Sequence, residues 1–428
     1  MNILVKSYGC SANFSDGEAI KGMLQAADFK IVDESEEEAA VVILNICTVK
    51  EDETALKEIK ETIEKRKYAH ILVAGCVPSG LIPKIREMKS GITIINTHNI
   101  REIVSAVEET INDNPQTILE PKRKPKILLN KIRDNPLIGI VPISNGCLGK
   151  CAYCSVKLIK GKLYSYPPDL IIKEVERCVK EGCKEIWITA QDTAAYGKDS
   201  SGNGNIAELL QKIVAVNGEF MVKLGTGNPN HIKENLDGLI TVLKNPKMYK
   251  FIHIPVQSGS NKILKAMIRP YTAEDFREIA ARLRKEIPEI TIATDVIVGF
   301  PGETTEQFYE TVKLIQGLKT SVANISKFAA RPDTAAANMK DQVESEEIQD
   351  RSGKMTTAVE FAAFDANKQW KGWQGEIFIY EKGKEGAMIG RNYAYKPVVV
   401  FEECKLGGRI KVKINGFVKN CLRGEKVI

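Results

Sequence analysis

The stretch Cys147-Leu148-Gly149-Lys150-Cys151-Ala152-Tyr153-Cys154 holds three thiols, with three and then two residues between them. We call Cys147, Cys151 and Cys154 the loop triplet. Cysteine thiolates are the usual ligands of iron–sulfur clusters, which generally take four of them. No fourth cysteine stands in this stretch, so a [4Fe-4S] cluster held here would keep one iron open, as a catalytic metal site requires. A zinc knuckle or a set of core thiols is the competing interpretation, but zinc prefers four ligands in paired CxxC spacing.

An apolar run at residues 138–143 precedes these thiols and predicts a buried strand. Further apolar runs at residues 185–189, 220–224, 251–254 and 291–298 alternate with helical patterns. This alternation predicts a full or partial β/α barrel, in which active sites form beyond the carboxyl ends of the strands. The loop triplet occupies such a position.

A second set of cysteines is spread over the amino-terminal part of the chain. Residues 1 to about 115 alternate strand and helix patterns, which predicts a parallel sheet. Cys10, Cys47 and Cys76, which we call the sheet triplet, each stand near the end of an apolar run. Ligand sites of parallel sheets lie beyond the carboxyl ends of the strands, so these thiols are expected to converge on one edge. The competing interpretation is that they are small core residues, since free cysteine is often buried.

The loop triplet resembles the cluster loop of radical S-adenosylmethionine (SAM) enzymes, whose open iron chelates the methionine part of SAM. The sheet triplet is similar to the amino-terminal domain of the methylthiotransferases, on the motifs Ser7-Tyr8-Gly9-Cys10-Ser11-Ala12-Asn13, Asn45-Ile46-Cys47-Thr48-Val49 and Gly75-Cys76-Val77-Pro78. This resemblance covers essentially the whole chain. It implies a partial barrel of six β/α units, SAM as a cofactor, and two [4Fe-4S] clusters, with the auxiliary cluster on the sheet triplet.

Polar residues stand at the carboxyl ends of several predicted barrel strands. One such turn is a weak signal, but several on one rim suit SAM, which needs hydrogen bonds to its carboxylate, ribose and adenine. The resemblance implies that Asp192 and Asp295 lie around SAM and that the Tyr153 backbone lies near its adenine. The predicted cofactor-binding residues are Tyr153, Gln191, Asp192, Asn228, His253, Gln257 and Asp295. His253 is equally well explained as a histidine satisfied within the core.

The tail of the chain predicts a small antiparallel β-barrel, because short strands stand there between glycine-rich turns. Residues 366–428 contain thirteen Lys or Arg and six Glu, a balance of +7, whereas the whole chain carries +6. A basic barrel with exposed aromatic residues suits a nucleic-acid backbone, although a solvated basic surface has the same composition. The motif Gly390-Arg391-Asn392-Tyr393-Ala394-Tyr395-Lys396 resembles the TRAM domain that binds tRNA in methylthiotransferases. Arg391 and Lys396 are therefore predicted to contact RNA.

These patterns divide the chain into four predicted parts. They are an amino-terminal methylthiotransferase domain with the auxiliary cluster (1–120), a basic linker (121–135), a radical SAM domain (136–365) and a TRAM domain (366–428). The linker is expected to be exposed, because it opens with the proline- and lysine-rich run Pro121-Lys122-Arg123-Lys124-Pro125-Lys126.

Length and composition predict the number of domains and the cellular compartment of the protein. Its length of 428 residues predicts two or three domains, and its hydrophobic share of 43% is that of a globular protein. No apolar run reaches the length of a membrane span, and no signal peptide is visible before the first predicted strand. Ten cysteines without a secretory signal indicate a reducing compartment. We therefore expect a cytoplasmic protein, and nothing in the sequence demands more than a monomer.

The segment after the loop triplet guides the prediction of the substrate. Methylthiotransferases act on adenosine 37 of tRNA, carrying an isopentenyl or a threonylcarbamoyl group, or on an aspartate of a ribosomal protein. Val156-Lys157 and Ser165-Tyr166-Pro167 are similar to the group that acts on threonylcarbamoyladenosine. That substrate bears a carboxylate, to which nearby lysines would offer a cation. The predicted substrate contacts outside the tail are Lys157, Lys160, Lys162 and Arg331.

The reaction implied by the resemblance adds a methylthio group to C2 of N6-threonylcarbamoyladenosine (t6A) at position 37 of tRNA. No side-chain base can remove hydrogen from an unactivated aromatic carbon, so the cofactors have to carry the chemistry. An electron from the loop-triplet cluster would cleave SAM to a 5′-deoxyadenosyl radical, and the sheet-triplet cluster would present a sulfur methylated by another SAM. We also expect an electron-donor protein as a partner, with the sulfur donor unidentified.

Two other classes of protein compete with this enzyme. A non-catalytic iron–sulfur carrier would need no open iron, no SAM-sized barrel and no basic tail. A plain RNA-binding module would need no cysteines at strand ends. The sequence therefore favours the enzyme.

Overall fold

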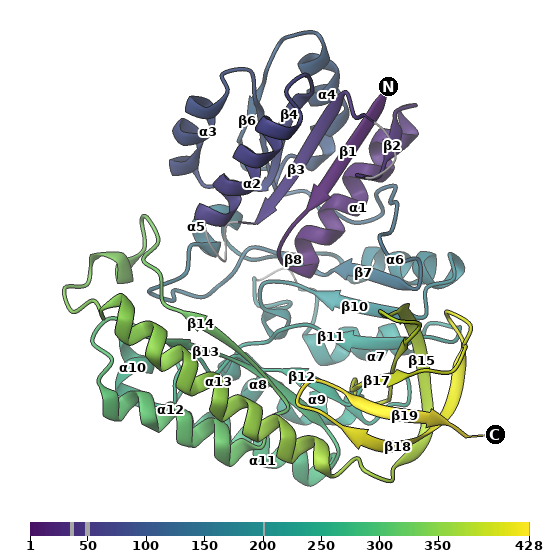
Figure 1. Cartoon of the computed structure of the whole chain (residues 1–428), viewed down its shortest axis with the longest axis vertical. Helices are drawn as coiled ribbons and strands as arrows, with labels where there is room; N and C mark the ends of the chain where they lie inside the picture. Colours follow the sequence, from purple (N-terminus) through teal and green to yellow (C-terminus); the bar gives the residue numbers. More distant parts are fainter. Residues whose placement is uncertain (35–37, 48–51, 200–201, 428) are drawn as a thin grey trace.

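The computed structural model describes residues 1–34, 38–47, 52–199 and 202–427, so Thr48 and Val49 of the second cysteine motif lie outside the described residues. Figure 1 shows a sheet flanked by helices, an open barrel next to it, and a small barrel packed against the side of the open barrel. Among the described residues, every helix is too short or too polar to span a bilayer.

The amino-terminal part is a parallel sheet with the strand order β2-β1-β3-β4-β5-β6. Its central strands are apolar along their whole length, because helices cover both faces of the sheet. On β3, Val42 and Leu44 pack into one core, whereas Val41 and Ile43 pack into the core on the opposite face. The elements are β1 (Asn2–Ser7), α1 (Ser11–Ala26), β2 (Lys30–Val32), β3 (Val41–Cys47), α2 (Asp52–Lys65), β4 (His70–Cys76), α3 (Ile82–Met88), β5 (Thr93–Asn96), α4 (Ile103–Ile111) and β6 (Thr117–Ile118).

The central part is the predicted partial barrel of six parallel strands. Its two halves have the orders β11-β10-β7 and β12-β13-β14, and a bridge between Thr226 and His253 joins them. The strands are β7 (Ile138–Pro142), β10 (Glu185–Thr189), β11 (Met221–Leu224), β12 (Phe251–His253), β13 (Thr291–Val298) and β14 (Val322–Lys327). The helices on their outer side are α6 (Pro168–Lys180), α7 (Ile206–Val214), α8 (Pro229–Glu234), α9 (Leu236–Leu243), α10 (Asn261–Ala266), α11 (Ala273–Glu286), α12 (Thr305–Leu318) and α13 (Ser345–Lys368).

The segment after the loop triplet contains the short helix α5 (Val156–Lys160) and the strand β9 (Tyr164–Ser165), which pairs with β8 (Ser144–Asn145) just before the triplet. In Figure 1 this segment lies between the open barrel and the amino-terminal sheet. It therefore reaches from the loop triplet toward the edge of the sheet that carries the other three cysteines.

The tail forms a closed barrel with the strand order β15-β16-β17-β19-β18. Four of its five pairings are antiparallel, as predicted, and the pairing of β17 with β19 is parallel. The strands are β15 (Gln374–Lys382), β16 (Met388–Arg391), β17 (Pro397–Val400), β18 (Arg409–Phe417) and β19 (Leu422–Lys426). The predicted fold class, an α/β chain of three such parts, is confirmed.

The prediction of an exposed linker is wrong for its second half. Lys126 is only 7% exposed and pairs with the buried Asp16 of α1. Ile127 is also buried, and Lys131 forms a buried ion pair of 3.3 Å with Glu174 of α6. The sequence shows a run of cations but not their partners, which come from distant elements on both sides. This segment therefore fastens the sheet to the barrel.

Candidate active site

The sheet triplet converges on one edge of the amino-terminal sheet. Cys47 ends β3 and Cys76 ends β4, and the two are direct register partners. Cys10 caps α1 just after β1, the neighbour of β3 on its other side. The Cys47 thiol hydrogen-bonds to both other thiols. Gly9 is required here, because its φ is +99° and a Cβ would lie 2.2 Å from the Cys47 Cβ.

Two thiols of the sheet triplet are poised to lose their protons. Hydrogen bonds from Cys47, together with the charge of Lys160, lower the pKa of Cys10 to about 5 and that of Cys76 to about 7. The pKa of Cys47 is raised because it donates these hydrogen bonds. Burial alone would lower the pKa of Lys160. The negative charges of Cys76 and Cys10 outweigh that effect and raise the pKa above its ordinary value, so Lys160 stays charged. The site thus favours thiolate, the form that binds metal.

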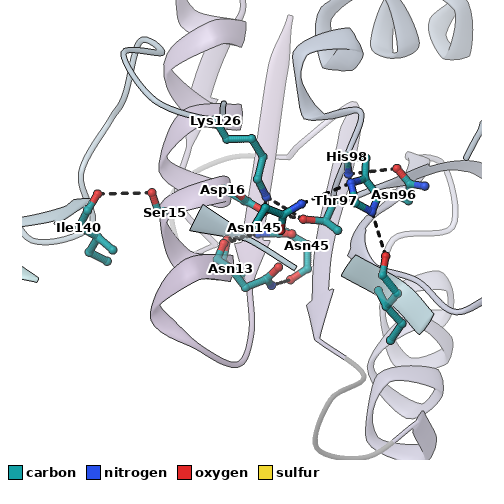
Figure 2. Close-up of polar contacts among 12 residues, drawn as sticks. Asn13, Ser15, Asp16, Asn45, Asn96, Thr97, His98, Lys126, Ile140 and Asn145 are labelled. Carbon is teal, nitrogen blue, oxygen red and sulfur yellow. Dashed lines mark hydrogen bonds and ion pairs between the residues drawn. The ribbon is translucent and has the colours of Figure 1, made fainter. Parts of the chain in front are cut away.

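A network of polar contacts behind the sheet triplet fixes its position (Figure 2). The Asn13 side-chain amide donates to the backbone oxygens of Tyr8 (2.7 Å) and Asn45 (2.9 Å). The Asn45 side-chain amide in turn donates to the backbone oxygen of Asn13 (2.7 Å). These bonds tie the turn at Cys10 to the end of β3. Asp16 accepts from Lys126 and from Thr97 Oγ1 (2.9 Å).

His98 connects this network to α5. Its Nε2 bonds to the Ile159 carbonyl at 2.9 Å, and its Nδ1 lies 3.4 Å from the Asn145 amide nitrogen. A neutral ring with the proton on Nε2 satisfies both contacts. Burial lowers the pKa of His98, which favours that neutral form. The ring therefore anchors α5 against the edge of the sheet.

The loop triplet is compact and has a different environment. Its three cysteines are half-buried, and the Gly149 N–H donates to Cys147 Sγ at 3.2 Å. A Cβ on Gly149 would lie 3.3 Å and 3.5 Å from the sulfurs of Cys147 and Cys151. The loop therefore folds with both thiols around this glycine. Burial raises the pKa of Cys147 to about 11 and also raises the pKa of Cys154.

Arg269 is a functional candidate that the sequence reasoning missed. It is 8% exposed, and its guanidinium donates to Cys151 Sγ (2.9 Å), Asn228 Oδ1 (2.6 Å) and Tyr271 OH (2.7 Å). It thus connects the loop triplet to the strand-end residues. It follows α10, far from the cysteines in sequence, and no spacing pattern marks it.

The residues predicted to surround SAM lie at the carboxyl ends of β10 to β12, except Asp295, which lies within β13. Asp192 is buried and accepts hydrogen bonds from the Asn228 backbone (3.1 Å) and side chain (2.6 Å), and it pairs with His231 at 2.7 Å. Gln257 is held to this rim by a backbone bond to the Asp295 carbonyl at 2.8 Å. Asn228, and through it Asp192, is therefore connected to Arg269.

His253 and Tyr153 already have partners within the chain. His253 Nε2 bonds to Asp295 at 2.9 Å and Nδ1 bonds to Thr226 at 3.1 Å. Both ring nitrogens are occupied, which favours the interpretation of a satisfied core histidine. The Tyr153 ring packs edge-to-face on Phe300, with centroids 6.4 Å apart.

The donor groups fit the expected cofactors. No three His, Cys, Asp or Glu side chains among the described residues are arranged to chelate one metal ion. A four-iron cluster does not require that arrangement, because each thiolate binds a different iron, and each triplet offers three thiols. Gln191 Oε1, at the rim beside Asp192, is buried and has no hydrogen-bond partner within the described chain. A ligand donor such as the amino group of SAM would satisfy it.

The two triplets lie at opposite ends of α5. Ser155 directly follows Cys154 and caps this helix, and Lys160 closes it beside the sheet triplet. Five helical residues span only about 8 Å. Across the same interface, Thr189 at the end of β10 bonds to Ser11, next to Cys10, at 3.4 Å. The carboxyl edge of the sheet and that of the barrel therefore face each other.

The predicted substrate contacts fall into two groups. Lys162 is exposed, and Lys157 and Arg331 are half-buried near the outer side of α5. The predicted contact Lys160 differs from these three, because it is only 2% exposed. Helix register explains the difference, because α5 turns this lysine inward to the sheet triplet.

The predicted RNA contacts Arg391 and Lys396 are engaged with other side chains of the chain. Arg391 forms a buried 2.7 Å ion pair with Glu185 of β10 and stacks on the Tyr380 ring at 3.5 Å. Lys396 is 5% exposed and donates to Asn367 at 2.8 Å. Burial lowers the pKa of Lys396 to about 7. These side chains hold the tail barrel against the rest of the molecule.

Comparisons with known proteins agree with this architecture. A model of the radical SAM superfamily matches residues 141–315, and a model described as uncharacterized protein family UPF0004 matches residues 2–97. The solved structure of the radical SAM methyltransferase TsrM from Kitasatospora setae has a TM-score of 0.57 at 15% identity, over 78% of this chain and 74% of that chain. That likeness is one of fold. The fold and the loop triplet thus define a radical SAM protein with an added amino-terminal cysteine domain.

Similar curated proteins cover almost the whole chain. It is 35% identical to the probable threonylcarbamoyladenosine tRNA methylthiotransferase of Pyrococcus horikoshii, over 99% of both chains. It is 36% identical to the threonylcarbamoyladenosine tRNA methylthiotransferases of Drosophila melanogaster and Homo sapiens, over 99% of this chain and 77% and 74% of theirs. The chain belongs to the threonylcarbamoyladenosine tRNA methylthiotransferase family. This membership supports the predicted cofactors, two [4Fe-4S] clusters and SAM.

Proposed function

We propose that this protein adds a methylthio group to C2 of t6A at position 37 of tRNA. The observation that carries the proposal is the second set of thiols, because the sheet triplet converges at the far end of α5 from the loop triplet. A radical SAM barrel that only cleaves SAM needs one triplet. The names of the relatives, which align over almost the whole chain, specify the tRNA substrate.

The loop triplet is proposed to hold the cluster that binds SAM. Arg269 donates to Cys151 and so places positive charge beside a thiolate ligand. The same guanidinium holds Asn228, which donates to Asp192, so hydrogen bonds connect the cysteine loop to the strand ends. When bound, the cofactors supply an electron, a carbon-centred radical derived from SAM, and a transferable methylthio group.

The sheet triplet is proposed to hold the auxiliary cluster that presents the sulfur. Lys160 supplies a buried cation beside its thiolates, which offsets part of their charge. Lys126 and Asp16 form a neutral pair behind it. Cys76 is buried in this site and Cys47 is half-buried, whereas Cys10 is exposed.

The remaining roles follow from the same placement. We assign residues 1–120 to the auxiliary-cluster domain, 136–365 to the radical SAM domain and 366–428 to the tRNA-binding barrel, with 121–135 as the packed connection. We also infer that the protein works as a cytoplasmic monomer that receives electrons from a donor protein. Exposed cations of the tail barrel, such as Lys411 and Lys413, replace Arg391 and Lys396 as the proposed RNA contacts there.

The test is anaerobic reconstitution with iron and sulfide, followed by SAM, dithionite and tRNA carrying t6A. Mass spectrometry of the digested nucleosides should detect the methylthio derivative of t6A. The Cys47→Ala variant should give none, whereas Cys178→Ala, which removes a buried thiol outside both triplets, should retain product. Methylthiolation of isopentenyladenosine tRNA instead of t6A tRNA would contradict the proposed substrate.

A further inference from the structure

A cavity of about 350 Å³ lies beside both triplets, and none of their six cysteines lines it. Most of its wall comes from four separate segments of the chain. They are residues 77–81 after β4, residues 121–124 of the linker, residues 158–162 of α5 and the following turn, and residues 331–333 after β14. The volume is within the range of small-molecule sites in proteins.

The cavity is close to the proposed reaction site. Val77 directly follows Cys76, Ser155 directly follows Cys154, and both residues line the cavity. Lys160 also contributes to the wall, while its charge acts on the sheet triplet. A base held between the triplets would therefore have its attached groups beside this cavity.

Positive charge dominates the wall. Two lining residues are Asp, whereas seven are Lys or Arg, namely Lys84, Lys122, Arg123, Lys124, Lys160, Lys162 and Arg331. Lys84, Arg123, Lys124 and Lys162 are exposed, and none of these four forms an ion pair with a carboxylate of the described chain. Ordinary protein surfaces intersperse both signs of charge. Four exposed cations without a carboxylate partner around one hollow favour an anionic ligand.

The same cavity has an apolar side. Leu81 and Leu119 line it, and Leu158 stands at its wall with 61% of its surface exposed. An inorganic ion alone would leave this apolar surface in contact with water. An organic anion, which carries its charge on a larger body, uses both sides of the cavity.

We infer that this cavity binds an oxyanion carried by the RNA substrate. Two groups near a t6A nucleotide have this chemistry, the carboxylate of its threonylcarbamoyl arm and the adjacent backbone phosphates. Both are held by Lys and Arg through charge-assisted hydrogen bonds. The inference rests on the proposed function and deepens it, because Lys84 of the amino-terminal domain and Lys124 of the linker join in recognition of the substrate.

Binding of RNA to the full chain tests the inference. The ligand is a fluorescent anticodon stem-loop with t6A, titrated at several salt concentrations against the double variant Lys84→Gln/Lys124→Gln. The dissociation constant should rise about tenfold. If the bound anion is a backbone phosphate, the slope of log affinity against log salt should also become shallower by about 1.4, which corresponds to two contacts to a single strand. The matched control, Lys262→Gln/Lys313→Gln, changes two exposed lysines elsewhere and should bind like the unmodified protein.

Two further RNAs identify the anion. One carries the methyl ester of t6A, and the other carries unmodified adenosine. If the carboxylate occupies the cavity, the double substitution weakens binding of t6A RNA alone, and if a phosphate occupies it, all three RNAs weaken equally. Affinities and salt slopes equal to those of the control variant for all three RNAs would overturn the inference.

Methylthio transfer is measured in parallel to separate this inference from the proposed function. The unmodified protein could transfer the methylthio group to t6A while the double substitution leaves RNA binding unchanged. That result would refute the proposed role of the cavity but not the proposed function. Loss of RNA affinity in the double variant, with no transfer by the reconstituted unmodified protein, would support the cavity and refute the function.

Discussion

The sheet triplet and the loop triplet offer the same three thiols but are built in opposite ways. Cys147, Cys151 and Cys154 lie within one loop, so their spacing alone brings them together. Cys10 and Cys76 are 66 positions apart and meet only because β1, β3 and β4 are adjacent parallel strands. The loop triplet therefore depends on the fold of one loop, whereas the sheet triplet depends on the assembly of the whole sheet.

Their electrostatic surroundings differ as well. Lys160 and hydrogen bonds between the thiols lower the pKa of two cysteines in the sheet triplet. Burial raises the pKa of Cys147 and Cys154, while Arg269 lies against Cys151. The sheet site thus favours thiolates, whereas Cys147 and Cys154 of the loop site keep their protons until metal displaces them.

Replacing each triplet in full should have the largest effect and should separate their roles. Alanine at Cys147, Cys151 and Cys154 should abolish both SAM cleavage and methylthiolation. Alanine at Cys10, Cys47 and Cys76 should abolish methylthiolation but leave SAM cleavage. Iron should fall by about four atoms per chain in either case. The measurements are iron content, 5′-deoxyadenosine release and nucleoside mass spectrometry, and loss of SAM cleavage in both variants would break the distinction.

Removing the cation beside each triplet should labilise only the neighbouring cluster. Lys160→Met should weaken iron binding at the sheet triplet, and Arg269→Met should weaken it at the loop triplet. Groups that support metal ligands are typically worth about 10–100-fold in affinity. Iron loss to a chelator, followed by electron paramagnetic resonance of each cluster, measures the effect. If both substitutions released iron from one and the same triplet, the comparison would be wrong.

Alkylation of the metal-free protein should show the difference in acidity directly. The pKa of Cys10 is lowered to about 5, so its thiolate exists at pH 7, whereas that of Cys147 is raised to about 11. Iodoacetamide should therefore modify Cys10 at least about tenfold faster at pH 7, because the thiolate is the nucleophile. Peptide mass spectrometry across pH 5–10 follows both sites. Equal rates at pH 7 would contradict the assigned environments.

A substitution in the tail barrel is expected to have the smallest effect on iron binding at either triplet. Arg391→Met leaves the buried Glu185 without its cation, which typically costs about 3–5 kcal/mol of stability. Thermal unfolding should shift to lower temperature, while iron content stays unchanged. Arg423→Met, at an exposed position of β19, is the matched control and should change stability by less than about 0.5 kcal/mol. Iron loss in the Arg391 variant would show that the tail supports the clusters.

The sequence predicts the cysteines well because strand ends are visible in it. Apolar runs mark β3 and β4, and Cys47 and Cys76 are their last residues. The rule that parallel strands end on one edge then places both thiols together. This rule does not predict the position of Arg269. That residue follows α10 and contacts Cys151 only because of how the barrel strands are arranged.

Charge is harder to place from sequence than thiols are. Arg391 and Lys396 belong to a basic segment, yet they pack against Glu185 and Asn367 in the interior. A lone sequence shows that a cation exists and not whether it faces water or another domain. The position of Lys160 on α5 likewise determines that its side chain is buried and does not face water.

Diffraction at the iron edge on crystals of the anaerobically reconstituted protein tests the central claim most directly. Two iron clusters are expected, one against the sulfurs of Cys10, Cys47 and Cys76 and the other against those of Cys147, Cys151 and Cys154, on facing edges of the sheet and the barrel. A single cluster on the loop triplet, with the three strand-end thiols free of iron at full reconstitution, would contradict the account.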